Sequence, residues 1–205
     1  MKKHLILTTI VLTAMLQACK DDRCECVPDD GNHPAEIIHH EINAIVAYQR
    51  HIEIDIDQNG EYDYSFGSVL IEENDLPYLY LFANGETTNG SKLLLQSNPE
   101  VLNARWARSL AKGAKIEDSA GNGNEWNVPQ MHGNIIGVRD NGVQKTYIGP
   151  WIGKQHAYMG MKFKINGKYH YGWIRITHVT GKEQILVEDY AYNNIPEQPI
   201  YAGQE

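Results

Sequence analysis

The fold of this chain is decided by residues 158–179, which read YMGMKFKINGKYHYGWIRITHV. Two runs rich in aromatic and β-branched residues flank Asn166 and Gly167, and both of these residues tolerate a positive φ. In the second run, Tyr169, Tyr171 and Trp173 occupy alternate positions. Because side chains on a strand alternate between two faces, the pattern predicts two antiparallel strands joined by a two-residue turn.

A second hairpin is predicted in the N-terminal half. Residues 51–56 place Ile52, Ile54 and Ile56 on one face, Asn59 and Gly60 follow, and residues 62–71 return as a strand. Further short runs of apolar residues between turn residues predict five more strands, over residues 79–82, 92–96, 134–138, 146–148 and 184–191.

One stretch has helical spacing. In residues 99–114, Leu102, Trp106 and Leu110 follow one another at intervals of four, which fits one face of a helix. The stretch is either a single crossover helix or another bent strand. About nine strands with regularly spaced turns predict an all-β protein, a β-sandwich or jelly-roll-like single domain over residues 35–205.

The N-terminus has the pattern of a secretory signal. Lys2 and Lys3 precede a short apolar run that ends in Leu16-Gln17-Ala18-Cys19. This ending resembles the lipobox of bacterial lipoproteins, which implies cleavage after residue 18 and a covalent lipid on Cys19. Residues 1–18 are thus the expected signal peptide, and the polar residues 19–34 a flexible, lipid-anchored tether.

The tether also bears on localisation. Lys20, Asp21 and Asp22 directly after Cys19 resemble the surface-export signal of lipoproteins in the Bacteroides–Flavobacterium group. The resemblance implies an outer-membrane lipoprotein displayed on the cell surface, with periplasmic retention as the alternative. Cys24 and Cys26 are separated by one residue, so a disulfide between them would close a small, strained ring. We therefore interpret them as two thiols of the tether that may or may not pair.

The charge of the chain excludes one class of partner. Cleavage would remove two of the 18 basic residues and none of the 26 acidic ones, which changes the net charge from −8 to −10. An acidic protein repels nucleic acid, so no nucleic-acid partner is expected. The expected attachment to the membrane is the N-terminal lipid.

The C-terminal half resembles a known family of secreted and surface β-sandwich proteins without an established function. The resemblance is carried by Tyr169-His170-Tyr171-Gly172-Trp173 and by Asp189-Tyr190-Ala191-Tyr192. An Asp-x-Asp-x-Asn-Gly segment, here residues 55–60, is common near the start of such domains. The family implies an extracellular β-sandwich, and it brings no reaction and no ligand.

The most site-like segment is acidic. Calcium prefers several oxygen ligands, and acids at alternate positions before a glycine resemble half of a calcium loop. The expected ligands are Asp55, Asp57, Asn59, Glu61 and Asp63. Phe66 stands where a helix–loop–helix site needs its bidentate glutamate. The alternative is that these side chains only satisfy the amides of a turn.

Two tryptophans are candidates for ligand binding. Trp126 and Trp151 occur in stretches rich in glycine, asparagine and proline, which predicts loops at the ends of the sandwich. Exposed there, they would suit sugar rings or protein partners; the alternative is that they cap the core. Trp173 is expected in the core.

No catalytic motif is present in the sequence. Gly-x-Ser-x-Gly and His-Glu-x-x-His are both missing. The histidines, His33, His39 and His40 in one group and His132, His156 and His170 in another, do not have the spacing of metal ligands. We therefore expect a non-enzymatic binding or adhesion module for glycan or protein on the cell envelope. The alternatives are a structural envelope protein with no small ligand and, third, a glycan hydrolase that uses Glu72, Glu73 and Asp75.

Overall fold

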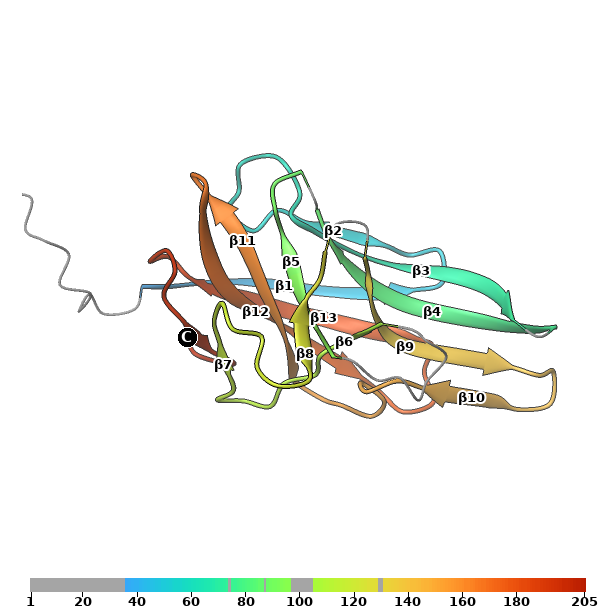
Figure 1. Cartoon of the computed structure of the whole chain (residues 1–205). Coiled ribbons are helices and arrows are strands. Elements are labelled where there is room, and N and C mark those ends of the chain that lie inside the picture. The colour runs from blue at the N-terminus through green and yellow to red at the C-terminus, as the bar shows by residue number, and fades with distance from the viewer. Residues whose placement is uncertain (1–35, 74, 87, 97–104, 129–130) are drawn as a thin grey trace, which may run out of the picture. The chain divides into compact units, whose positions relative to one another are not determined.

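The computed structural model describes residues 36–73, 75–86, 88–96, 105–128 and 131–205 (Figure 1). All of them belong to the second of the two units into which the chain divides, Met1–His33 and Pro34–Glu205. The described residues contain no helix. Their strands are β1 (Ile37–Ala47), β2 (Ile52–Ile54), β3 (Tyr64–Glu73), β4 (Leu76–Gly85), β5 (Lys92–Gln96), β6 (Trp106–Ala107), β7 (Lys115–Ile116), β8 (Asn124–Trp126), β9 (Gly133–Asp140), β10 (Lys145–Ile148), β11 (Ala157–Ile165), β12 (Lys168–His178), β13 (Gln184–Asn193) and β14 (Ile200–Tyr201).

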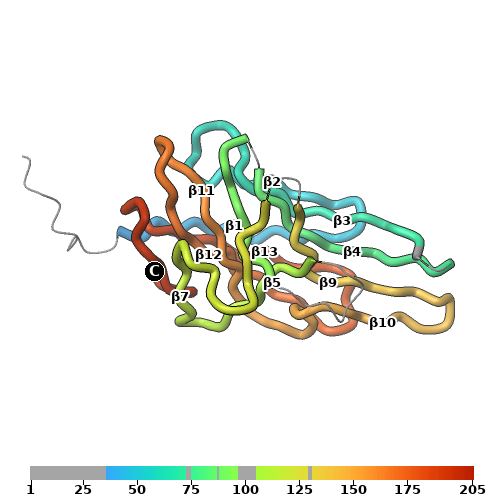
Figure 2. Tube along the Cα trace, in the orientation of Figure 1, coloured from blue at the N-terminus to red at the C-terminus, as the bar shows by residue number. Residues whose placement is uncertain are grey.

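The strands form two layers that share β5. One layer has the order β1-β13-β12-β11, and the other contains β9, β4, β3 and β2, with β10 beside β9. Lys92 and Leu93 at the start of β5 pair with β11, whereas Leu95 and Gln96 at its end pair with β6, which leads on to β9. The hydrogen bonding is thus continuous from one layer to the other. Figure 2 follows the Cα trace through both layers.

The main core lies between the layers. Ile174 and Val187 of the first layer and Phe66, Leu81 and Ile136 of the second belong to one buried apolar cluster. The Tyr64 hydroxyl of the second layer donates to the Lys162 carbonyl of the first, at 2.8 Å. The all-β fold predicted from the sequence is therefore confirmed, and the arrangement is that of a β-sandwich.

A second apolar cluster covers the outer face of the first layer. Trp173, Tyr171 and Tyr158 point away from the main core, and the segment with β7 and β14 covers them. Trp173 is fully buried, as expected. Because β12 is covered on both faces, its residues 170–174 are all buried.

The hairpin over residues 158–179 forms as predicted. Asn166 and Gly167 have φ of 51° and 80°, and Ile165 pairs with Lys168 across the two-residue turn. The N-terminal hairpin also forms, since β2 pairs with β3, but its connection is not a two-residue Asn-Gly turn. A nine-residue loop, 55–63, joins the strands, and its positive φ values occur at Gln58 and Gly60.

All five further predicted strands are present, as β4, β5, β9, β10 and β13. The expected strands did not include β1. Asn43 has a φ of 53°, and the pairing with β13 shifts between Glu41 and Ala44. Exposure nevertheless alternates from Ile38 to Ala44, and Ile38, Ile42 and Val46 contact the core.

The helical reading of residues 99–114 is wrong over the part that the structure describes. Trp106 and Ala107 form β6, and Leu110 makes an antiparallel bridge to Tyr158. Trp106 packs with Tyr80 outside the second layer, whereas Leu110 packs outside the first. Four residues of helix advance by about 6 Å, but an extended segment advances by about 13 Å and so can pass from one layer to the other. Residues four apart lie on the same face both of a helix, with its period of 3.6 residues, and of a strand, with its period of two.

Candidate functional site

The acidic loop between β2 and β3 brings three carboxylates together. One oxygen from each of Asp55, Asp57 and Asp63 lies within 4.8 Å of the other two, and they are the only such group of potential ligands among the described residues. Calcium binds oxygens at about 2.3–2.6 Å, so oxygens on opposite sides of one ion are about 5 Å apart. The three carboxylates therefore have a spacing that fits calcium.

The same carboxylates hold the loop in shape. The Asp55 carboxylate accepts hydrogen bonds from the backbone amides of Asn59 and Gly60, at 3.1 and 2.8 Å. The side-chain oxygen of Asn59 accepts one from the Glu61 amide at 2.7 Å. These bonds replace the two-residue turn, and they use one of the two lone pairs on each Asp55 oxygen.

Asp63 is the buried member of the group. Its carboxylate accepts hydrogen bonds from the Ile56 amide at 2.8 Å, the Asn89 side chain at 2.7 Å and the Ser91 hydroxyl at 3.1 Å. The pKa of Asp63 is raised to about 6. Burial is the largest cause and the charges of Asp57 and Asp55 add to it, whereas the hydrogen bonds from Ile56 and Ser91 act in the opposite direction. A bound cation would favour the ionised carboxylate.

The side chain of Glu61 lies apart from this group, whereas the ligand expected from Glu61 is its backbone carbonyl. Its side chain lines a separate shallow hollow with Gly60, Tyr62, Glu86 and Thr88. The negative charge of Glu86 is the main cause that raises the pKa of Tyr62 in this hollow. Of the five expected calcium ligands, the structure thus groups the carboxylates of three.

Trp126 and Trp151 do not lie on exposed loops. Trp151 is fully buried in the main core, where its indole N–H donates to the Ala107 carbonyl at 2.8 Å. Trp126 lies in β8 and is partly buried, and its N–H donates to the Asp118 carbonyl at 2.8 Å. Trp151 therefore has no surface that a ligand could contact.

The face of Trp126 is already in contact with a cation of the same chain. The ammonium of Lys162 lies 4.9 Å from the Trp126 ring centre and 4.8 Å from that of Tyr169. It also donates to the Asp118 carboxylate at 2.8 Å. This arrangement satisfies a lysine whose side chain is almost fully buried.

The histidines do not come together as metal ligands in the described residues. As expected for neighbours on a strand, His39 and His40 point to opposite faces: His39 bonds Asp189, and His40 packs against the Tyr190 ring. His33 lies outside the described residues. His132, His156 and His170 have separate partners: the Phe82 ring, the Glu188 carboxylate and the Asn193 carbonyl.

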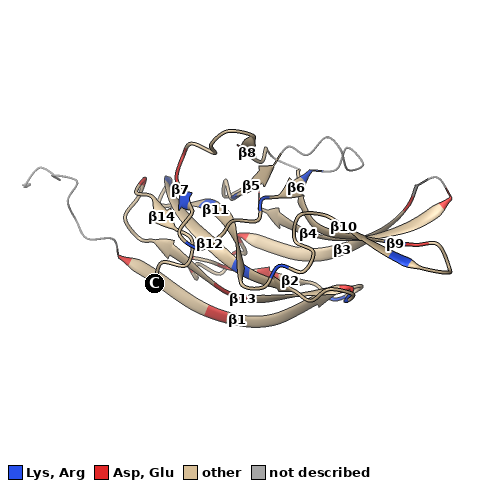
Figure 3. Cartoon of the chain, turned by 90° about the horizontal axis from the view of Figure 1, so that it is seen from below, with Lys and Arg blue, Asp and Glu red and all other residues tan. Residues whose placement is uncertain are grey.

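The acids considered for a hydrolase lie at the tip of the β3–β4 hairpin. Glu72 pairs in register with Pro77, and Glu72 and Asp75 are both exposed. Figure 3 shows the β3–β4 and β9–β10 hairpins extending together at one end of the sandwich.

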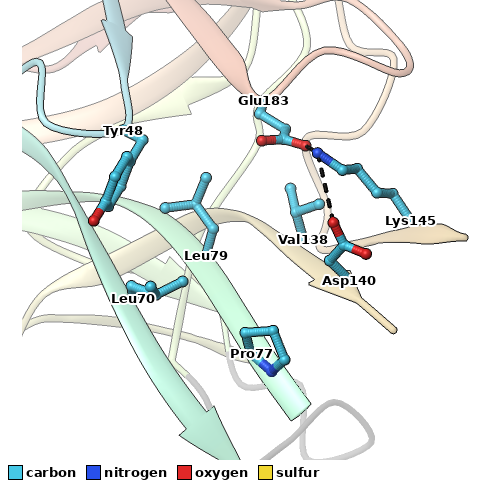
Figure 4. Close-up of a pocket in the computed structure, with 8 residues that line it drawn as sticks. All are labelled: Tyr48, Leu70, Pro77, Leu79, Val138, Asp140, Lys145 and Glu183. Carbon is cyan, nitrogen blue, oxygen red and sulfur yellow. Dashed lines mark hydrogen bonds and ion pairs between the residues drawn. The ribbon is translucent and has the colours of Figure 1, made fainter. Parts of the chain in front are cut away.

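A cleft that the sequence did not reveal lies at one end of the sandwich (Figure 4). It has a volume of about 260 Å³ and is mostly apolar. Its lining residues are Tyr48, Leu70, Pro77, Leu79, Val138, Asp140, Lys145 and Glu183. We refer to it as the Tyr48 cleft.

The floor of the Tyr48 cleft continues the core-facing side of the second layer. On β3, Phe66 is fully buried in the core, whereas Leu70, two alternations further along, is 55% exposed. On β4 and β9, Leu79 and Val138 mark the edge of the core. The strands of the second layer thus extend beyond the region that the first layer covers, and their apolar face becomes accessible there.

Three charged side chains close one side of the Tyr48 cleft. Lys145 of β10 forms an ion pair with Glu183 from the β12–β13 loop, and its ammonium lies 3.7 Å from the Asp140 carboxylate. Tyr48, from the turn after β1, stands on the other side of the floor (Figure 4) and is 52% exposed. The cleft combines an apolar floor, one aromatic wall and one charged wall.

Comparison with protein-family models, with curated proteins and with solved structures finds no match to this chain. The resemblance to secreted β-sandwich proteins therefore stays a prediction. Cys19, Cys24, Cys26 and the signal-like segment lie outside the described residues. In the described part of the chain, no helix is long and apolar enough for a membrane span.

Proposed function

We propose that this protein is a lipid-anchored binding module of the cell envelope, displayed on the outer membrane, and that it binds an extracellular glycan or protein through the Tyr48 cleft. The observation that carries the proposal is the cleft itself. Mostly apolar concavities with a few convergent polar groups are the usual form of binding sites. The proposal assigns the protein no catalytic step.

The position of the cleft supports this role. The described chain enters the sandwich at the start of β1, and Tyr48 follows directly after the end of that strand. Eleven residues of strand span about 35 Å. A tether attached before β1 would therefore leave the Tyr48 cleft at the end of the domain farthest from the point of attachment.

We also propose that the acidic loop binds a calcium ion that stabilises the domain. The spacing of the Asp55, Asp57 and Asp63 oxygens supports this, as does the raised pKa of Asp63, because a cation would offset the repulsion among the three acids. Backbone carbonyls and water would have to supply the remaining ligands.

A purely structural envelope protein remains the second candidate. The burial of Trp151 and the pairing of Trp126 with Lys162 favour it, because both tryptophans then serve packing alone. This candidate assigns no ligand to the Tyr48 cleft.

The test uses the full mature chain in lipid nanodiscs on glycan and extracellular-matrix arrays. Leu70→Glu places a charge in the Tyr48 cleft, and Val69→Glu places it on the opposite face of the same strand, where Val69 is also exposed. We expect binding that survives Val69→Glu and is lost in Leu70→Glu. If both variants still bind, the Tyr48 cleft is not the binding site. If the wild type binds nothing on the arrays, the structural candidate is favoured.

A further inference from the structure

Exposed apolar side chains concentrate around the Tyr48 cleft. Tyr48 and Leu70 line it and are each about half exposed, whereas the exposed Val69 and Ile71 lie on the opposite face of β3. Val179 is half exposed in the neighbouring β12–β13 turn, and it lines a second shallow hollow with Ile45 and Leu186. Clusters of this kind at one end of a domain mark contacts with other molecules rather than packing of the domain itself.

The walls of the cleft favour a protein over a sugar. Sugar sites stack rings on aromatic side chains, and here the wall offers a single tyrosine, while the floor consists of Leu70, Leu79 and Val138. An apolar centre beside a charged edge is instead the usual anatomy of a protein–protein interface. The volume of about 260 Å³ is enough for one large side chain.

The charges at the edge favour a basic partner. Two carboxylates, Asp140 and Glu183, flank one ammonium, that of Lys145, and all three side chains are between 34% and 47% exposed. Asp140 is the acid farther from Lys145, at 3.7 Å, and its other carboxylate oxygen accepts a hydrogen bond from the Gly142 amide at 2.8 Å. A cation brought by the partner would balance the excess negative charge at this edge.

Building on the proposed binding function, we propose that the Tyr48 cleft takes a leucine-sized apolar side chain of a partner protein, next to a basic residue that pairs with Asp140 and Glu183. The apolar side chain contacts Leu79 and Val138 on the floor and the Tyr48 ring on the wall. Its burial also removes part of Leu70 from water. The basic residue steers the partner into the cleft.

The experiment is a titration of the ¹⁵N-labelled mature chain in lipid nanodiscs with three synthetic peptides. The first, acetyl-GRLRG-amide, has both proposed features. The second, acetyl-GRARG-amide, keeps the charge and lacks the large apolar side chain, and the third, acetyl-GELEG-amide, keeps the leucine and reverses the charge. Methyl glycosides serve as the sugar probe.

We expect acetyl-GRLRG-amide to shift the amide signals of Tyr48, Leu79 and Val138 at saturable, millimolar concentration, with at least tenfold weaker effects of the other two peptides. Leu70→Glu should abolish the shifts and Val69→Glu should leave them. Equal binding of acetyl-GRARG-amide or acetyl-GELEG-amide, or no shift at the cleft with any peptide, overturns the inference. Glycoside shifts at the same amides would also overturn it while leaving the proposed function intact, whereas array binding that Leu70→Glu retains would refute the proposed function itself.

Discussion

The ammonium of Lys162 lies between the rings of Trp126 and Tyr169, 4.9 and 4.8 Å from their centres. The sequence predicted that Trp126 is exposed and available to a ligand, but its ring contacts a lysine of the same chain. The pair connects β8 to β11 on the outer face of the first layer. Its role is therefore expected to be stability, and this can be measured.

Lys162→Ala should lower the free energy of unfolding by about 1–3 kcal/mol, because it removes a buried aliphatic stem and two cation–π contacts. Lys164→Ala is the matched control. Lys164 is exposed, and its ammonium lies 5.0 Å from the centre of the Tyr169 ring, so we expect an effect below about 1 kcal/mol. Urea unfolding of both variants measures the difference, and equal losses would show that the contacts around Lys162 contribute nothing specific.

Gly149→Ala should destabilise the fold by at least about 2 kcal/mol. Gly149 has a φ of 116°, and an added Cβ would lie 2.4 Å from the Trp106 ring and 2.9 Å from the Ile135 carbonyl oxygen. Gly142, with a φ of 79° and no atom within 4 Å of an added Cβ, is the control. Gly142→Ala should cost only about 1 kcal/mol, from the positive φ. Thermal unfolding that ranks the two variants the other way would contradict this packing.

Asp63 should make the calcium-free protein less stable as the pH rises. Its pKa is about 6 in the folded state, above the usual value of 3.8, so the folded state binds more protons than the unfolded state between these values. Stability from this group is present below pH 4 and is lost as the pH rises through 6. Asp63→Asn should flatten the pH dependence of the unfolding free energy by on the order of 1 kcal/mol. An unchanged slope in the variant would mean that Asp63 titrates normally.

Calcium removal should lower the melting temperature of the wild type by several degrees at neutral pH. EDTA should have no such effect on Asp57→Ala, which lacks one of the three grouped carboxylates. Glu53→Ala removes a nearby acid that is not part of the group and should respond to EDTA like the wild type. The same melting curve for the wild type in calcium and in EDTA would leave the acidic loop with its turn-forming role alone.

Cys19→Ala should abolish metabolic labelling of the protein with a radioactive or clickable fatty acid. The expected reason is that the thiol is the only acceptor that the lipobox-like segment offers. Cys24→Ala, in the same tether, serves as the control and should label normally. A labelled Cys19→Ala protein would contradict the assignment of the anchor.

The all-β class and most strands could be predicted because their signals are local. Asn166-Gly167 between two alternating runs specifies a hairpin through backbone conformation alone. Asn59-Gly60 has the same two residues, but Asp55 and Asp63 accept backbone amide hydrogen bonds and hold a nine-residue loop instead. The Asn-Gly pattern does not take into account that side-chain carboxylates compete with backbone carbonyls for the same amide N–H groups.

One error arose where a spacing of four residues fits two structures. Trp106 and Leu110 are four apart in an extended segment rather than on a helix. The Tyr48 cleft was missed for a different reason. Leu70 lies on the same face of β3 as the buried Phe66. The sequence of β3 does not show at which residue the opposite layer stops covering this face.

The pairing of β1 with β13 has a mechanical consequence. The two strands pair over nine residues, from Ile37 with Asn193 to Ala47 with Gln184. A tether that pulled at the start of β1, against a partner held at the Tyr48 cleft, would load this ladder along the strand axis, because its hydrogen bonds run across that axis. The bonds would then share the force in shear and fail together rather than unzip one by one.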